Sequence, residues 1–418
     1  MLKDLFPQGY FRYASLPLLG GLMDEFTRWL AEQGYTRGTR RLQIRDTFRI
    51  DGYLRRRGVR DVSEITHDHL NACWTWYRRR SPGLASAAHV LEHFVGVHEL
   101  VPPPVIKSPS RTSVQITAYS DYLRDVRGFG HSAVRNHMFT ARQFLDHLQY
   151  ESEPSSLEVL APSEIERFVQ RTGKTRGRAS LQHTVAHLRS FLRFLAATRL
   201  VRPGLDREID TPRLYRLEKL PRAMPWATVR AFLDSIDRTT RLGFRDYTMF
   251  FFMATYGLRC CEIVALTLDA IDWRAESFQV RSRKNGGALV LPLTEDAGAL
   301  LLNYLQRGRP ASPRREVFLR MRAPAGAMKP TAVGEAFRGQ IRKSGLEIPL
   351  QGPHCLRHSY AVHLLRLGTS LKSIGDLLGH RLAESTCMYL RLAIDDLREV
   401  ALPVPLEDPG ADKVEAQS

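Results

Sequence analysis

The sequence predicts a mostly α-helical protein of the α+β class, with one small antiparallel β-sheet in its C-terminal half. Three observations predict this class. Apolar residues recur at helical spacing through most of the chain. Residues 277–293 instead alternate apolar and polar side chains around an Asn285-Gly-Gly287 turn, which is typical of a β-hairpin. Proline-rich stretches separate the helical segments into blocks, because proline removes a backbone donor and ends helices.

Two stretches are expected to be linkers. The first is Val101–Ser110, and the second runs from Val201 to about Trp226 with prolines at 203, 212, 221 and 225. They leave three blocks, at 15–100, 112–200 and 222–401. Residues 402–418 are polar and acidic without periodicity, so we expect a disordered tail.

The first two blocks resemble each other. Gly34-Tyr-Thr-Arg37 and Gly128-Phe-Gly-His131 each open a helical pattern of similar length, which ends at Tyr53-Leu54 or at His147-Leu148. We therefore expect a tandem repeat of a small helical module; the alternative is chance similarity between amphipathic helices. Both modules carry basic side chains around their helix starts: Arg37, Arg40, Arg41, Arg45 and Arg78–Arg80 in the first, and Arg135, Arg142, Lys174, Arg176 and Arg178 in the second.

The chain is strongly basic. Its 418 residues hold 61 Lys and Arg against 44 Asp and Glu, which gives a formal net charge of +17. Such a balance favours a polyanionic partner, and nucleic acid is the first candidate. The alternatives are a generally basic proteome, a membrane-surface protein, or, for any single run of charges, a solvated face.

The cysteines predict free thiols in a reducing compartment, because their number, five, is odd and no secretory spacing appears. The most apolar run, Met249–Leu258, is about half the length that spans a bilayer, so a buried helix is expected there. We find no signal-peptide pattern. A soluble cytoplasmic protein without membrane contact is the expectation.

The third block holds residues suited to phosphodiester transfer. Such a reaction needs cationic groups for the transition-state charge, a general acid for the leaving oxygen, and a nucleophile. The block supplies these in order: Arg259 after a glycine, Lys284 on the predicted hairpin, His354 and Arg357 three residues apart on one face of a helix start, His380 beyond a glycine helix cap, and Tyr389 nine residues later.

This ordered set resembles the tyrosine recombinase (phage integrase) family, of the mobile-element type. The motifs are Gly257-Leu-Arg259, Lys284 eight residues before Pro292, His354-Cys-Leu-Arg-His358, Leu378-Gly-His380 and Tyr389. The resemblance covers about residues 226–396. It also extends to the second block, which is similar to the core-binding, SAM-like DNA-binding domain of the family, and it leaves the first block as an extra DNA-binding copy.

The resemblance implies roles for six residues. Arg259 and Arg357 would bind the scissile phosphate, and His354 and His380 would hydrogen-bond its oxygens, with His354 assisting proton transfer from the tyrosine. Lys284 would protonate the leaving 5′ hydroxyl, and Tyr389 would form a 3′-phosphotyrosine. No metal and no nucleotide cofactor would be needed. His358 is expected to be structural.

The resemblance also implies partners. These are a double-stranded DNA recombination site, a homodimer on each site, a tetramer at synapsis and companion recombinases. The segment Ile394–Ala401 would pass between protomers.

Other functions remain open from the sequence. A type IB topoisomerase-like nicking-closing enzyme would share the chemistry, and a DNA-binding accessory protein would use the fold without catalysis. A helical interaction module is disfavoured by the basic charge. A zinc site at His354, Cys355, His358 and His363 is also disfavoured, because no carboxylate base and no CxxC pair accompany them.

Overall fold

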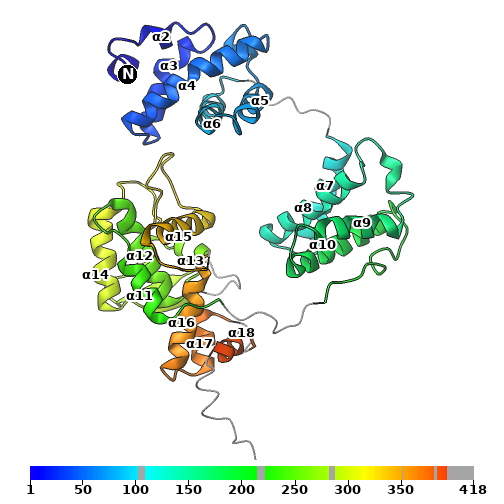
Figure 1. Cartoon of the computed structure of the whole chain (residues 1–418), viewed down its shortest axis with the longest axis vertical. Helices are drawn as coiled ribbons and strands as arrows, with labels where there is room; N and C mark the ends of the chain where they lie inside the picture. The colour runs from blue at the N-terminus through cyan, green and yellow to red at the C-terminus, as the bar shows by residue number, and fades with distance from the viewer. Residues whose placement is uncertain (102–108, 214–221, 282–287, 351, 381–383, 393–418) are drawn as a thin grey trace, which may run out of the picture. The chain divides into compact units, whose positions relative to one another are not determined.

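The computed structural model describes residues 1–101, 109–213, 222–281, 288–350, 352–380 and 384–392. Much of each predicted linker, the tip of the hairpin with Lys284, the segment 394–401 and the tail lie outside these residues. The chain forms helical modules and one block with a three-stranded sheet (Figure 1). The predicted fold class, mostly α-helical with a small antiparallel sheet, is therefore confirmed.

The first module is all helical, and its helices begin before the expected residue 15 because Leu2 and Leu5 are buried. Its core includes Phe26 of α3 and Phe94 of α6, whose ring centroids lie 5.0 Å apart. The elements are α1 (Leu2–Leu5), α2 (Phe11–Ala14), η1 (Gly20–Leu22), α3 (Met23–Glu32), α4 (Arg37–Arg56), η2 (Val62–Glu64), α5 (His67–Tyr77) and α6 (Pro82–Val97).

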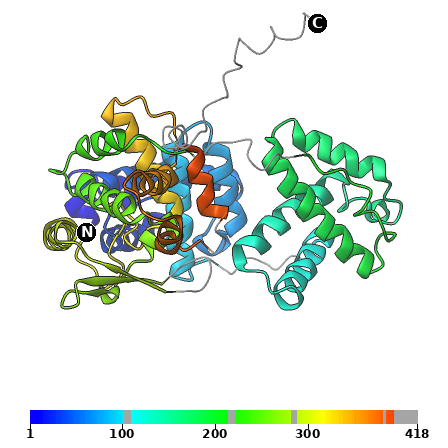
Figure 2. The same cartoon turned by 90° about the horizontal axis from the view of Figure 1, so that it is seen from below.

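The second module packs four main helices around buried aromatic side chains such as Tyr119 and Phe191. Figures 1 and 2 both show these helices gathered around one core. The elements are α7 (Arg111–Asp121), the π-helical η3 (Tyr122–Val126), α8 (His131–His147), η4 (Pro154–Ser156), α9 (Pro162–Gly173) and α10 (Arg178–Ala197). Val201, Leu205 and Ile209 are buried in the same core, so the start of the expected second linker packs onto this module.

The two modules share one plan, as the internal repeat predicts. In each, a left-handed glycine, Gly34 at φ 80° or Gly128 at φ 63°, precedes the second long helix. That helix packs against the fourth long helix in both modules, α4 against α6 and α8 against α10.

The third block combines helices with the sheet. Its helices are α11 (Trp226–Asp234), α12 (Arg241–Tyr256), α13 (Cys260–Val264), η5 (Leu268–Ala270), α14 (Glu295–Asn303), the π-helical η6 (Tyr304–Gly308), α15 (Pro330–Ser344), α16 (His354–Arg366), α17 (Leu371–Leu378), α18 (Glu384–Cys387) and the 3-10 helix η7 (Met388–Leu392). The strands are β1 (Ile271–Asp272), β2 (Ser277–Val280) and β3 (Leu289–Pro292), in the order β1-β2-β3.

The predicted hairpin is present as β2 and β3, which pair antiparallel with Ser277 opposite Pro292 and Val280 opposite Leu289. Phe278 and Val280 are the buried residues of β2, and the ring centroid of Phe278 lies 4.9 Å from that of Tyr256 on α12. The sheet is thereby fixed to the helix that leads to Arg259. Among the described helices, none is long and apolar enough to cross a lipid bilayer.

Candidate functional site

Arg259 lies where α12 ends and α13 begins. Gly257 ends α12 in the left-handed conformation, with φ 62°, and Arg259 is the N-cap of α13. The buried Glu262 holds Arg259 twice, because its Oε2 accepts from the Arg259 backbone N–H at 2.8 Å and its Oε1 accepts from the guanidinium at 2.7 Å. The guanidinium is therefore oriented by its own helix while about a fifth of the side chain stays exposed (22%).

Arg357 is buried on α16, with only 1% of its surface exposed. Its guanidinium donates to the backbone carbonyl of Gly257 at 2.6 Å and to that of Leu378. Gly257 is the C-cap of α12, and Leu378 is the last residue of α17. The Arg357 side chain therefore connects α16 to the ends of α12 and α17. Because both acceptors are neutral carbonyls, the positive charge is kept inside the site rather than cancelled by these partners.

His380 follows the end of α17. Gly379 caps that helix in the left-handed conformation, with φ 63°, and turns the chain so that His380 Nδ1 lies 2.9 Å from the Thr386 hydroxyl of α18. The imidazole ring stacks over that of Tyr389 with a centroid distance of 6.3 Å and an interplanar angle of 17°.

Tyr389 is buried at the centre of this group, with 1% exposure. Its hydroxyl lies 3.1 Å from Nδ1 of His358 on α16. His358 in turn meets the ring of His354 edge-on, with centroids 4.6 Å apart. The structure thus brings five of the six predicted residues into one neighbourhood, and Lys284 lies outside the described residues.

The electrostatics of the group keep a neutral imidazole beside the tyrosine. Burial, with His354 and Arg357 nearby, lowers the pKa of His358 to about 4, so this imidazole is neutral at neutral pH. Burial raises the pKa of Tyr389, while the charges of Arg357 and Arg259 lower it. A protonated phenol therefore faces a neutral imidazole, and the two arginines would stabilise the phenolate formed by proton transfer.

His358 was expected to be structural, but it is the histidine in contact with the Tyr389 hydroxyl. His354 is in edge-on ring contact with His358, and the pKa of His354 is lowered by burial and by Arg357 and Arg259. The signal in the sequence was the position of His358, one residue after Arg357 and four after His354. As for the zinc alternative, the described residues hold no group of three or more His, Cys, Asp or Glu side chains arranged for a metal ion.

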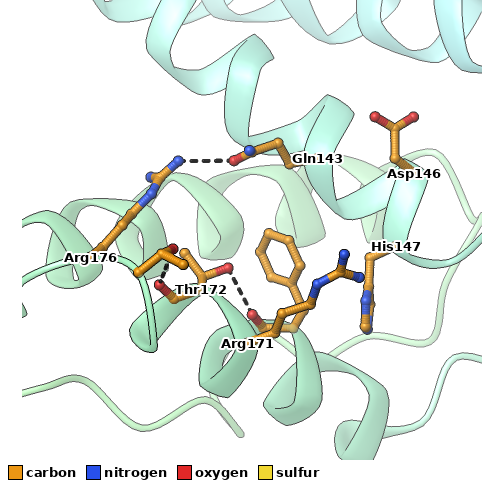
Figure 3. Close-up of a pocket in the computed structure, with 8 residues that line it drawn as sticks. Gln143, Asp146, His147, Arg171, Thr172 and Arg176 are labelled. Atoms are coloured by element: carbon orange, nitrogen blue, oxygen red, sulfur yellow. Dashed lines mark hydrogen bonds between the residues drawn. The ribbon is translucent and has the colours of Figure 1, made fainter.

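A cavity lies in the second module, lined by α8, α9 and the loop after it (Figure 3). This cavity of about 380 Å³ is lined in part by His147, Arg171 and Arg176. Arg176 donates to Gln143 Oε1 at 3.0 Å and to the Thr184 hydroxyl at 2.8 Å. These neutral partners fix the guanidinium without pairing its charge, and the carboxylate of Asp146 also lines the cavity.

The chain matches two family models. Residues 224–395 match the phage integrase family, and residues 116–199 match the phage integrase N-terminal SAM-like domain. Among curated proteins, y4rA of Sinorhizobium fredii, named as an integrase/recombinase, is 32% identical over 91% of this chain and 93% of its own. Tyrosine recombinase XerD of Listeria monocytogenes is 28% identical over 66% of this chain and 92% of its own.

Solved structures show the same fold. The XerH recombinase bound to its difH substrate aligns with a TM-score of 0.54, at 16% identity, over 70% of this chain and 89% of that one. A lambda integrase dimer bound to a core site aligns with a TM-score of 0.52, at 16% identity, over 66% and 94%. Fold and site thus define a protein of the DNA strand-exchange class. The chain belongs to the phage integrase family, whose members are the tyrosine recombinases.

Proposed function

We propose that this protein is a site-specific DNA recombinase that cleaves and rejoins strands through a 3′-phosphotyrosine on Tyr389. One observation carries the proposal: the Tyr389 hydroxyl lies 3.1 Å from His358 Nδ1, and the positive charges of Arg357 and Arg259 act on the same phenol. A tyrosine in a merely structural role would need neither the neutral acceptor nor the two cations.

Each neighbour has a chemical task in this proposal. His358 accepts the phenol proton as the Tyr389 oxygen attacks the scissile phosphorus, with His354 in ring contact behind it. Arg259 and Arg357 meet the charge on the phosphate oxygens, and His380 adds a hydrogen bond. Lys284 protonates the 5′ oxygen that leaves. The phosphotyrosine bond conserves the energy of the broken phosphodiester, so resealing needs no nucleotide and no metal.

The two helical modules hold the duplex in this proposal. The second module presents Arg171 and Arg176 at one cavity, which Asp146 also lines, and the two guanidinium groups suit a backbone phosphate. The partner is double-stranded DNA that carries a recombination site, bound by a homodimer at each site and by a tetramer at synapsis. The names of the relatives, integrase and recombinase, support this assignment.

The test is a covalent capture assay. The purified protein is incubated with DNA that flanks its own gene, and the reaction is stopped with SDS. We expect a protein–DNA adduct that is absent for Tyr389→Phe, while Tyr389→Phe still shifts the same DNA in a gel. An adduct that persists in the Phe variant would overturn the assignment of the nucleophile.

A further inference from the structure

The first module, which neither family model covers, carries an unusual helix. Helix α4 has 20 residues and is therefore about 30 Å long. Its exposed face presents arginines along its whole length, and Phe48 lies among them with 45% exposure. The arginines of this face, which we call the α4 arginine face, are Arg37, Arg41, Arg45, Arg49, Arg55 and Arg56.

The α4 arginine face keeps most of its charge. Asp46 pairs with Arg45 of this face at a long distance, 4.0 Å between the carboxylate oxygen and Arg45 Nε. Arg37 donates to the backbone carbonyl of Asp4, and Arg41 lies 5.1 Å over the ring of Phe6. Such neutral partners orient the guanidinium groups without cancelling their charge.

The other carboxylate of the helix is turned inward. Asp51 is 2% exposed, and its Oδ1 accepts from the backbone N–H groups of Leu18 at 3.0 Å and Leu19 at 2.9 Å. Asp51 therefore holds the Pro17–Leu19 loop against the helix instead of pairing with a surface arginine. The Asp51 carboxylate therefore accepts hydrogen bonds inside the module, while the arginines lie on its surface.

The face ends in a cavity of about 530 Å³. The residues that line it are Pro17, Leu18, Gly52, Arg55, Arg56, Val59 and Arg60, so its lining has three arginines and no carboxylate. Glu64 approaches the Arg60 backbone, accepting from its N–H at 2.7 Å. Gly52 contributes no side chain to the cavity, and a Cβ there would make an ordinary van der Waals contact of 3.7 Å with the Arg56 guanidinium.

We infer that the α4 arginine face, with the cavity at its end, is a second binding surface for the phosphate backbone of duplex DNA. Arginines four residues apart are separated by about 6 Å along the helix, and one DNA strand presents a charge about every 3.4 Å along its axis. The length of α4 is close to one turn of B-DNA, about 34 Å. Arginine also matches phosphate oxygens with paired N–H donors. The inference rests on the proposed function only for the identity of the partner as DNA.

The decisive variant is Arg45→Gln/Arg49→Gln/Arg56→Gln in the full-length protein, three exposed positions on one side of α4. Binding to a duplex of unrelated sequence is measured at several salt concentrations. Each phosphate contact contributes about 0.9 to the slope of log K against log salt, so the triple variant should lower the slope by about 2 to 3. The three corresponding Arg→Lys changes keep the charge and should keep most of the slope.

The matched control removes the same charge from the same module. Arg78→Gln/Arg79→Gln/Arg80→Gln alters three arginines outside α4. An equal loss of slope in this control, or an unchanged slope in the α4 variant, would overturn the inference. Gly52→Met fills the cavity without a change of charge and should weaken binding. Retained DNA binding together with lost binding to anionic lipid vesicles would assign the face to a membrane instead.

Failure of this inference is separable from failure of the proposed function. The α4 variant keeps Tyr389 and its neighbours, so at saturating protein it should still form the covalent adduct on DNA that flanks the gene. An unchanged salt slope with a normal adduct would reject the α4 surface alone. If the unaltered protein itself formed no adduct, the proposed mechanism would be rejected.

Discussion

At the scale of single residues, the contact between His358 and Tyr389 predicts that His358 accepts the phenol proton during strand cleavage. Replacing His358 with alanine removes the acceptor 3.1 Å from the phenol, so strand cleavage should slow by about 10²-fold or more. The measurement is the rate of adduct formation in a single turnover. Because the pKa of His358 is about 4, the rate should not fall between pH 8 and pH 5.5 through protonation of this group.

His363 offers a control on the same helix. Its ring stacks on Trp226 with a centroid distance of 4.1 Å, away from the tyrosine contact. His363→Ala should cleave at close to the normal rate. If His354→Ala were slow and His358→Ala were normal, the proton would pass to His354, and His358 would not be the proton acceptor.

His137, in the core of the second module, predicts a pH dependence of stability. Burial, His187 and Arg127 lower its pKa from 6.5 to about 4, and its Nδ1 lies 2.9 Å from the Tyr119 hydroxyl. Below pH 6.5, His137 is protonated in the unfolded chain but stays neutral in the folded module. The folded state therefore loses stability as the pH falls toward 4. At pH 5 the loss is about 2 kcal/mol, from about 1.4 kcal/mol per pH unit.

His137→Gln removes this proton linkage. Between pH 7 and pH 5, the melting temperature of the second module should therefore fall less in the variant than in the unaltered protein. The measurement is calorimetry of both proteins over that range. Parallel curves would show that His137 does not carry the linkage.

Several residues of the candidate site could be named from the sequence, because order and spacing along the chain specify their positions. Arg259, Arg357, His380 and Tyr389 each follow a local signal, either a glycine helix end or a fixed interval. The contact of His358 was not predictable, because it depends on where η7 packs against α16. Spacing places His358 on a helix, but only the tertiary packing decides which side chain meets Tyr389.

At the scale of elements, the glycines that end α12 and α15 can be compared to measure how much close packing at Gly257 constrains the site. Gly257 and Gly345 both have left-handed φ values, 62° and 67°. A Cβ at Gly257 would lie 2.7 Å from Leu378 Cδ2 and 2.8 Å from Tyr360 Cδ1, whereas Gly345 has nothing within 4 Å. Gly345→Ala should cost about 1–2 kcal/mol for the backbone, and Gly257→Ala should cost about 1–3 kcal/mol more for overpacking.

Urea denaturation of the two variants measures this difference. Gly257→Ala should also slow strand cleavage, because the Gly257 carbonyl accepts from Arg357. Equal destabilisation of the two variants would mean that the neighbours of Gly257 relax without cost.

The elements themselves were only partly predictable. The sequence shows helical periodicity from Trp226 to about Leu258 without marking a break, but the structure divides this segment into α11 and α12. The break is local, because Asp237 accepts from the Thr239 backbone N–H at 2.9 Å and the Thr240 hydroxyl caps α12 at Gly243. The spacing of apolar residues after residue 384 is also that of an α-helix, whereas α18 ends at Cys387 and Tyr389 lies in the 3-10 helix η7. Hydrophobic spacing does not distinguish these tighter turns from an α-helix.

At the scale of the whole molecule, a catalytic block suited to strand transfer is joined to two helical modules with basic surfaces. Such a protein can do two things with a covalent intermediate. It can reseal the same strand, as a nicking-closing enzyme does, or it can exchange strands between two bound sites. The family of the chain favours exchange.

A supercoiled plasmid that carries two copies of the flanking DNA separates these outcomes. With EDTA present we expect recombinant circles of two sizes, because Arg259 and Arg357 supply the positive charge at the phosphate that a metal ion would otherwise supply. Tyr389→Phe should give neither recombinants nor relaxation. Relaxed circles without any exchange would assign the protein to the nicking-closing class, and activity that EDTA abolishes would show that the two arginines are not sufficient.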